Sequence, residues 1–532
     1  MNYTYNEDNR MTSLNDWLGT SGNTTDFSYN ANSDLTTVTY PSGTSLTDTI
    51  AYNTLDQITS VASNTSTEYY GRASNGFQSS FTPNGGTSEP YSYNGSNQVT
   101  QGLGQTFNYS SGQEISCLTA SNSSSYSCSS QNASYSTDYY YGSQGGTTGP
   151  EVGCSLPGTT SQSYCTSPSV SGESLFTYSS IGNRVQSQAF SGSSSTYTAY
   201  GYDSQGNLNC IATNATGGTA CSGQSSYSSM SYNADGERVT ETPQGGSAMT
   251  FTWNSVGMAV PRIVADGTNS YIYGPDIFGW GNVPVEQING TTPQYLESDI
   301  SGVRIVRNSS GTGLTIKGYT PYGTESLMGS ASTTPFGFEG GYEDFNESST
   351  QSGLLYFVHR DYDPATGQFI QVDPAFDVTL QAYAFVGGDP VNASDPSGNS
   401  CVTLDAKGTG GMTPQEIAQA EQARNALAQQ KGGGFVAISP NDLPNPNSGF
   451  PNVTNTCYPQ YQQCSPPKPV NAYTCSEALF SLVFGGILTI GGAIWGIATS
   501  PTGVGAAIGV STIAVGAGTI GYSVTDLARG AC

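Results

Sequence analysis

The chain has 532 residues, of which only 10% are charged, and its 14 Lys and Arg against 39 Asp and Glu give a net charge of −25. A surface of this sign repels phosphate backbones, which argues against a nucleic-acid partner. Ser, Thr, Asn, Gly and 35 tyrosines are abundant, a composition typical of turn-rich β-structure and not of a helical cytosolic enzyme.

The N-terminus shows no secretory signal, because the stretch from Met1 to Leu14 has no apolar core after a basic region. It resembles the middle of a repeat. We expect either a dedicated export route or a reading frame that is the C-terminal part of a longer gene or system.

Residues 1–350 repeat one short pattern. Each unit has an aromatic residue at a strand end, a turn of Asn, Asp or Gly, and a second strand with alternating apolar residues. This pattern predicts one β-hairpin for each unit. The units begin at Tyr5, Tyr29, Tyr52, Tyr93, Tyr178, Tyr202 and Tyr232.

A single hairpin is not stable in water, so we expect neighbouring hairpins to stack into an extended sheet that curls or spirals. The repeated tyrosines are interpreted as a packing ladder between strands. The alternative is a row of aromatic side chains that binds glycans.

Six of the 11 cysteines form three pairs with equal spacing, across loops rich in Ser, Thr and Gly. This spacing favours local disulfides and lacks the close C-x-x-C steps of zinc sites, so we predict no metal and no cofactor. Because disulfides persist in oxidising surroundings, we expect a secreted or cell-surface protein, with free thiols as the alternative. The pairs are Cys117 and Cys128, Cys154 and Cys165, and Cys210 and Cys221.

The most specific motif lies within residues 351–399. It consists of Leu355-Tyr356-Phe357, His359-Arg360, Tyr362-Asp363-Pro364-Ala365-Thr366-Gly367, Phe369-Ile370-Gln371, Asp373-Pro374 and Asp395-Pro396-Ser397-Gly398. This spaced set resembles the core-domain signature of Rhs/YD-repeat proteins, which include bacterial polymorphic toxins, toxin-complex C subunits and, more distantly, teneurins.

The resemblance implies an all-β fold, in which YD-repeat hairpins over residues 1–350 form a spiralling, N-terminally incomplete shell closed by a core plug at 351–399. In this family the segment after the core is a variable passenger, often a toxin. In many members two core aspartates cut the chain just after the closing motif. The matching positions are Asp373 and Asp395, with the scissile bond between Asn399 and Ser400 and with Arg360 as a supporting residue.

Paired carboxyl groups suit this chemistry, because two of them within hydrogen-bond reach do not both ionise readily, so one acts as acid and the other as base. The sequence departs from the family pattern at Phe376, where glycine is usual, and at Asn399, where leucine is common. Gln368 and Val372 also stand where arginine or another polar residue is frequent. The alternative is that both Asp-Pro steps are only turns.

The composition changes after the core. Residues 400–477 contain a predicted helix from Thr413 to about Gln430, followed by a Pro/Asn-rich linker. Two uncharged runs within 478–522 predict a helical hairpin long enough to span a membrane, before a short tail at 523–532. The alternative is an apolar element buried inside the shell.

No further enzyme motif is present. The only histidine, His359, lies in the core motif, so a Ser-His-Asp or Cys-His site in residues 400–532 is excluded, and a P-loop and an H-E-x-x-H pair are absent. We therefore predict a shell that encloses and delivers its own C-terminal passenger, a membrane-active toxin, with self-cleavage as its only chemistry. A secretion-system component or an N-terminal shell portion is the expected partner. The alternative is a membrane-anchored adhesin whose repeats bind glycans or another partner.

Overall fold

The computed structural model describes residues 1–19, 23–110, 114–119, 136–141, 151–157, 165, 171–217, 220–255, 260–275, 283–329, 333–343, 353–374, 381–399 and 402–403. The helix predicted at 413–430 and the hairpin predicted at 478–522 lie outside these residues. Within the described ranges, no helix has the length and apolarity needed to cross a membrane.

Regular structure in the described part of the chain consists of β-strands and two short 3-10 helices, which confirms the expected β-class up to residue 399. The first sheet contains β1 (Asn2–Tyr5), β2 (Met11–Asn15), β3 (Thr24–Tyr29), β4 (Leu35–Thr39), β5 (Thr47–Tyr52), β6 (Ile58–Ala62), β7 (Thr67–Arg72), β8 (Gln78–Thr82) and β9 (Glu89–Pro90).

The second sheet contains β10 (Ser92–Tyr93), β11 (Val99–Gly102), β12 (Gln105–Tyr109), β13 (Ile115–Thr119), β14 (Ser136–Tyr141), β15 (Val152–Pro157), β16 (Ser174–Tyr178), β17 (Arg184–Ser191), β18 (Ser194–Tyr202), β19 (Leu208–Thr213), β20 (Ser228–Tyr232), β21 (Arg238–Thr242) and β22 (Met249–Thr250). The helix η3 (Cys221–Gly223) comes after β19.

The third sheet contains β23 (Thr252–Asn254), β24 (Arg262–Ala265), β25 (Asn269–Ile272), β26 (Glu286–Asn289), β27 (Thr292–Asp299), β28 (Gly302–Asn308), β29 (Gly313–Tyr319) and β30 (Glu325–Gly329). Two small sheets come next, with β31 (Tyr342–Glu343), β32 (Leu355–Phe357), β33 (Arg360–Asp363) and β34 (Gln368–Phe369) in one, and β35 (Ala393–Ser394) and β36 (Val402–Thr403) in the other. The helix η4 (Val386–Gly388) lies between them in sequence.

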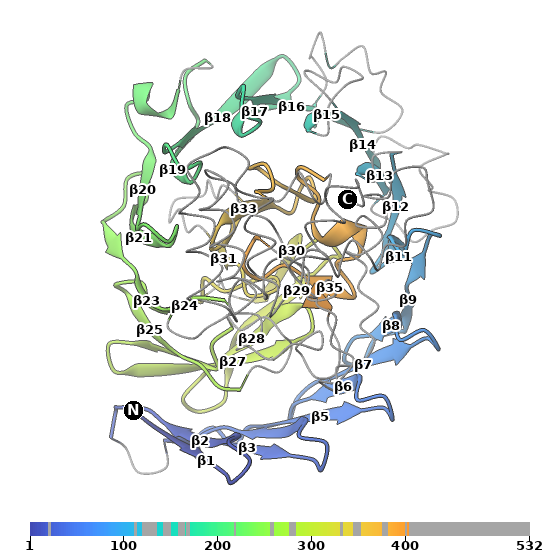
Figure 1. Ribbon diagram of the computed structural model, residues 1–532, viewed down its shortest axis with the longest axis vertical. Helices are drawn as coiled ribbons and strands as arrows, with labels where there is room; N and C mark the ends of the chain where they lie inside the picture. The colour runs from blue at the N-terminus through green and yellow to red at the C-terminus, as the bar shows by residue number, and fades with distance from the viewer. Residues whose placement is uncertain are drawn as a thin grey trace, which may run out of the picture.

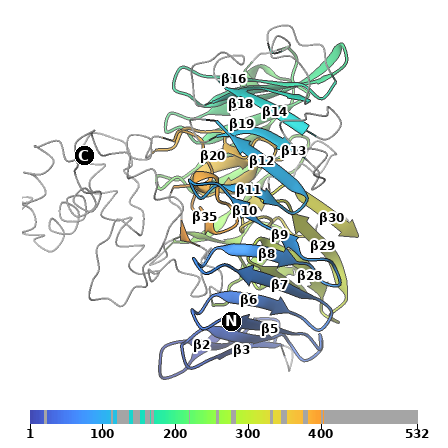
Figure 2. The same cartoon turned by 90° about the vertical axis from the view of Figure 1, so that its right-hand side faces the viewer.

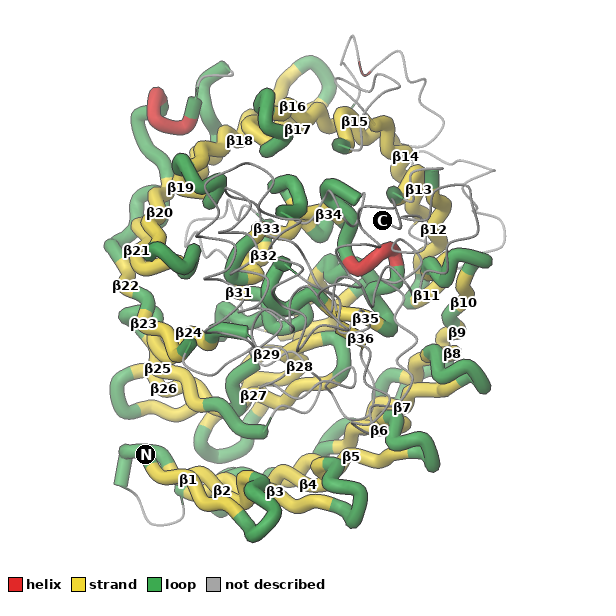
Figure 3. The backbone as a smooth tube through the Cα atoms, in the orientation of Figure 1, coloured by secondary structure: helices red, strands yellow, loops and turns green. Residues whose placement is uncertain are grey.

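Within each sheet, every strand pairs with its neighbours in sequence, so each sheet is a continuous meander. The strands β1–β25 form a curved wall around an interior that holds β31–β35 (Figures 1 and 3). Seen from the side, successive hairpins of this wall are stacked on one another (Figure 2). We call β1–β30 the shell, and the described residues between 333 and 403 the plug.

The two ends of the shell meet. The hydroxyl of Tyr40 donates to the carbonyl of Leu296 at 3.2 Å, and that of Tyr70 donates to Asp299 at 3.1 Å. One apolar core joins side chains of β2–β8 to Ile288 and Tyr295 of the third sheet. The start of the chain and the strands just before the plug are therefore packed together, as Figure 1 also shows.

The turns explain the recurring Asn or Asp after the aromatic residue. In the β3–β4 hairpin, the side-chain oxygen of Asn30 accepts hydrogen bonds from the backbone N–H groups of Asn32 and Asp34, both at 2.9 Å. An amide or carboxylate that bonds the following backbone in this way stabilises a tight turn. The same two bonds occur at Asn6, Asn53, Asn94, Asp203, Asn233 and Asn308.

In at least six of the hairpins, the tyrosine at the end of the first strand bonds to the hairpin before it. Tyr202, the last residue of β18, donates its hydroxyl to the carbonyl of Arg184, the first residue of β17, at 2.6 Å. The same hydrogen bond, from a tyrosine hydroxyl to a backbone carbonyl, joins Tyr29 to Met11, Tyr52 to Leu35, Tyr109 to Val99, Tyr178 to Val152, and Tyr232 to Leu208. The ladder of tyrosines therefore joins consecutive hairpins by hydrogen bonds as well as by packing.

Replacement of Tyr202 by Phe tests this ladder. The change keeps the ring and removes the bond to the Arg184 carbonyl, so we expect the free energy of unfolding to fall by about 1–2 kcal/mol. Urea unfolding followed by tyrosine fluorescence gives the value. Tyr69→Phe is the control, because that side chain is 55% exposed, and an equal loss in both variants would contradict the ladder.

Several acidic side chains are buried in the shell and the plug. Burial raises the pKa of Glu68 on β7 to about 7, helped by the charge of Asp299. Burial and the neighbouring Asp16 raise the pKa of Glu286 on β26 to about 8. Burial also raises the pKa of Asp389 to about 8, although Asn392 donates to its carboxyl group.

These shifts predict a shell that is more stable in acid. Each pKa is higher in the folded chain than the value of about 4 for an unfolded carboxyl, so the stabilising contribution is complete below about pH 4 and is lost as the pH rises through about 7 to 8. The midpoint temperature of thermal unfolding should therefore decrease as the pH is raised from 5 to 9. Each group contributes at most about 1.4 kcal/mol per pH unit.

The net negative charge of the chain also lowers its stability as the pH rises, because like charges repel one another. The test therefore needs a matched pair of variants. Glu286→Gln should flatten the pH dependence of the thermal midpoint, whereas Glu7→Gln removes an exposed charge and should leave the slope unchanged. Equal slopes in Glu286→Gln and the unmutated protein would show that burial of this carboxyl does not govern the effect.

Candidate functional site

The central strand of the plug, β33, is buried along its whole length. Its residues are Arg360, Asp361, Tyr362 and Asp363, and none is more than 9% exposed. The ring of Tyr362 packs in an aromatic cluster, 4.4 Å from the ring of Phe385. Because three of the four residues are charged at neutral pH, the strand is stable only if each buried charge has a partner.

Two of these partners come from the shell. The guanidinium of Arg184 on β17 contacts Asp363, with Nη1 and Oδ2 2.6 Å apart. The guanidinium of Arg238 on β21 contacts Asp361, with Nη2 and Oδ1 3.3 Å apart. Both arginines are at most 1% exposed, and each is the first residue of a second hairpin strand. Two repeats of the shell are thus bound to the plug by buried ion pairs.

We expect Asp363→Asn to lower the free energy of unfolding by about 3–5 kcal/mol, since it leaves the buried Arg184 charge without its partner. Asp8→Asn breaks an exposed pair with Arg10 and should cost about 0–1 kcal/mol. Chemical unfolding of the two variants measures the difference. Equal losses would contradict the role of the buried pair.

The third charged residue of β33 organises the candidate site. Arg360 Nη2 lies 3.0 Å from Oδ2 of Asp395, and its Nη1 lies 3.5 Å from Oδ2 of Asp373. The guanidinium also lies 3.7 Å from the centre of the Phe369 ring. The two aspartates singled out in the sequence are therefore brought to the two ends of one buried guanidinium, although they are on different segments of the plug.

The same arginine contacts the chain next to the predicted cut. Arg360 Nε donates to the carbonyl of Gly398. Gly398 has a φ of +69°, and a Cβ atom there would lie 2.5 Å from the Phe357 carbonyl, so the close approach requires glycine. The N–H of Asn399 donates to the Ser397 hydroxyl at 3.2 Å, and Asn399 is buried.

The segment just after the predicted cut, β36, pairs with another strand of the plug. Ser400 lies outside the described residues, but β36 pairs with β35, with Ala393 opposite Thr403 and Ser394 opposite Val402. In sequence, the Asn399–Ser400 bond therefore falls between these two paired strands.

The closing Asp-Pro motif does form a turn, since the N–H of Gly398 donates to the carbonyl of Asp395 at 3.1 Å. The side chain of Asp395 nevertheless points to Arg360. Among the positions where the sequence departs from the family pattern, Gln368 and Val372 lie in the described plug, whereas Phe376 lies outside the described residues.

The sequence did not single out Glu339, Arg184 or Arg238 as parts of this region. Glu339 lies in the turn before β31 and is completely buried near Asp395. A signal for the two arginines exists, because both come directly after a Gly-Asn or Gly-Glu turn of a repeat in a chain with few basic residues. No comparable signal marks Glu339.

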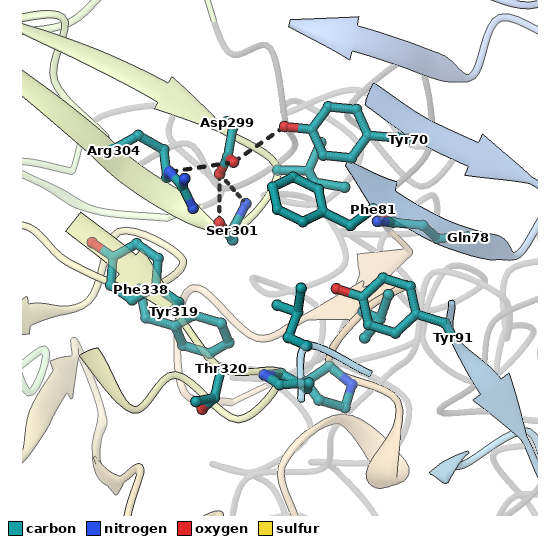
Figure 4. A pocket seen from close by; sticks show the side chains of 15 residues that line it. Tyr70, Gln78, Phe81, Tyr91, Asp299, Ser301, Arg304, Tyr319, Thr320 and Phe338 are labelled. Carbon is teal, nitrogen blue, oxygen red and sulfur yellow. Dashed lines mark hydrogen bonds and ion pairs between the residues drawn. The ribbon is translucent and has the colours of Figure 1, made fainter. Parts of the chain in front are cut away.

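A small cavity of about 40 Å³ separates the shell from the plug (Figure 4). Its wall includes Tyr70, Tyr91, Asp299, Arg304 and Phe338, and Asp299 accepts the Tyr70 hydroxyl and lies 3.7 Å from Arg304 Nε. This space has room for about three water molecules and is far smaller than the roughly 300 Å³ of a small-molecule site. The cavity is therefore too small to bind a small-molecule ligand.

The cysteine pairs have the predicted partners where both members are described. Cys154 is bonded to Cys165, and Cys210 to Cys221. Cys117 is also disulfide-bonded, while Cys128 lies outside the described residues. Within the described part of the chain, no group of His, Cys, Asp and Glu side chains is arranged to hold a metal ion.

No protein-family model and no curated protein matches the chain by sequence. Solved structures with similar arrangements include the crystal structure of TcdB2-TccC3-Cdc42, with 14% identity over 75% of this chain and a TM-score of 0.47. The crystal structure of TcdB2-TccC3 has 14% identity over 74% of the chain and a TM-score of 0.46. The Photorhabdus luminescens Tc holotoxin pore has 14% identity over 70% and a TM-score of 0.34. The matches span 20% to 21% of those chains.

Proposed function

We propose that the protein is a β-shell that encloses its own C-terminal segment and separates itself from that segment by cutting between Asn399 and Ser400. The observation that carries the proposal is the position of Arg360, which contacts Asp373, Asp395 and the Gly398 carbonyl at once. One buried side chain thus joins a pair of carboxyl groups to Gly398, the residue that precedes Asn399.

The arrangement suits hydrolysis by an acid–base pair. One aspartate takes a proton from water while the water oxygen bonds to the carbonyl carbon of Asn399. The carbon–nitrogen bond then breaks, its electron pair stays on the Ser400 nitrogen, and the protonated partner delivers a proton to that nitrogen. One water is consumed, and the products are a carboxyl terminus at Asn399 and an amino terminus at Ser400.

Burial favours this chemistry over simple turn formation. Both aspartates are buried against Arg360, which brings their side chains to one place inside the plug, whereas simple surface turns would leave them in solvent. The pairing of β35 with β36 would retain the new N-terminal end of the passenger after the cut.

We propose that the passenger, residues 400–532, acts on membranes through residues 478–522.

The disulfides support work outside the cytoplasm, because they persist in oxidising surroundings. An export component or a further shell portion remains the proposed partner. Chain continuity distinguishes this proposal from an anchored adhesin, because the shell should yield two polypeptides and the adhesin would remain one.

Cleavage is tested on denaturing gels of the purified protein. We expect two bands, corresponding to residues 1–399 and 400–532, with Ser400 as the first residue of the smaller one. Asp373→Asn and Asp395→Asn should each lower the rate by about 10²–10⁴-fold, as expected for an acid–base group. The exposed Asp235→Asn should cleave normally.

Near-ultraviolet circular dichroism of the two uncleaved variants shows whether they are folded. A folded, unmutated protein that remains a single full-length band would contradict self-cleavage.

A further inference from the structure

We propose that Glu339 is a positioning residue of the cleavage site, whose neutral carboxyl group beside Asp395 sets the upper pH limit of self-cleavage. The inference rests on the proposed function, and it adds a third carboxyl group and a regulation by pH to that site.

The backbone at Glu339 is held in a conformation that glycine would occupy more easily. Its φ of 48° is in the left-handed region, which non-glycine residues rarely adopt. Its N–H donates to the Ser301 carbonyl at 2.9 Å. On the other side, Gly302 presses against the same turn, since a Cβ atom there would lie 2.9 Å from the Glu339 nitrogen. The shell hairpin β27–β28 thus fixes this turn.

The side chain of Glu339 is buried without a charge partner. It is 0% exposed, and it forms no ion pair with a described residue. Neither carboxyl oxygen has a hydrogen bond of normal geometry to a described residue. An ionised carboxylate in such a position is strongly disfavoured, because nothing replaces the water that it has lost.

Its neighbours indicate what the neutral group does. Burial raises the pKa of Glu339 well above its ordinary value, and the charge of Asp395 raises it further. The Ser394 hydroxyl and the Asp395 backbone N–H are near enough to lower this pKa in part, although neither makes a hydrogen bond of normal geometry to the carboxyl group. Among the described residues, Tyr362 also interacts with Glu339, and burial raises the pKa of Tyr362 well above its ordinary value.

In the part of the chain that the structure describes, the ion pairs of the cluster leave no cation for Glu339. Arg360 contacts Asp395 and Asp373, and no cation contacts Glu339 among the described residues. While Glu339 is neutral, the aspartate pair and Arg360 form the working arrangement. When Glu339 loses its proton at high pH, a second negative charge is placed beside Asp395, which competes for Arg360 and loosens its contact with the Gly398 carbonyl.

The test measures cleavage of the full chain from pH 5 to pH 9. Uncleaved chain recovered in denaturant is diluted into redox-buffered solutions, and the two fragments are quantified on gels with time. We expect the rate of the unmutated protein to fall on the alkaline side. In Glu339→Gln, which cannot ionise, this fall should move up by at least about 1 pH unit or disappear, with the rate at pH 6 changed less than about 10-fold.

Two further variants show whether the change in the alkaline fall comes from the Glu339 carboxyl group or from a general loss of stability. Glu339→Asp keeps a titratable carboxyl group and should keep the alkaline fall. Glu286→Gln makes the same chemical change at a buried acid of the shell and should leave the profile in place.

Cleavage with superimposable profiles in the unmutated protein and folded Glu339→Gln would overturn the inference alone. If Glu339→Gln does not fold, an alkaline fall that is absent from Glu339→Asp would overturn it. No cleavage of the unmutated chain at any pH would overturn the proposed function and, with it, this inference.

Discussion

The structure depends on the pairing of the charges on β33. A strand with Arg360, Asp361 and Asp363 in the centre of an apolar plug is unstable by itself, because unpaired buried charges cost about several kcal/mol each. Arg184 and Arg238 reach it from two hairpins of the shell. Arg238 also pairs with Glu241 on its own strand at 2.9 Å, whereas Arg184 pairs with Asp363 of the plug. Shell and plug therefore stabilise one another chiefly through the pair of Arg184 and Asp363.

This pairing also determines what Arg360 can do. Since the shell arginines take Asp363 and Asp361, the remaining charge on β33 is left to the carboxyl groups of the plug. Arg360 then draws Asp373 and Asp395 together and contacts the carbonyl of Gly398. The candidate site is thus a consequence of how the plug is anchored, and Glu339 adds its carboxyl group from a turn that β27–β28 holds in place.

The sequence was informative wherever a local pattern repeats. The hairpins, their Asn turns and the equal cysteine spacing depend on residues close together in the chain, and the motif of the plug indicated Asp373 and Asp395. It could not show the contact of Arg184 with Asp363, because the two residues are 179 positions apart and no periodicity relates them. Glu339 was missed for a similar reason, as its burial depends on packing against the shell turn at Ser301. The targets of the tyrosine hydroxyls likewise depend on the stacking of separate hairpins.

The most direct test of this mutual dependence is a double-mutant cycle on the pair between shell and plug. The free energy of unfolding is measured for the unmutated protein, Arg184→Met, Asp363→Asn and the double variant. If β33 is held by this pair, the double variant should be less destabilised than the sum of the single variants, with a coupling energy of about 2 kcal/mol. Additive losses, within about 0.5 kcal/mol, would contradict the claim that the shell arginines hold the plug in place.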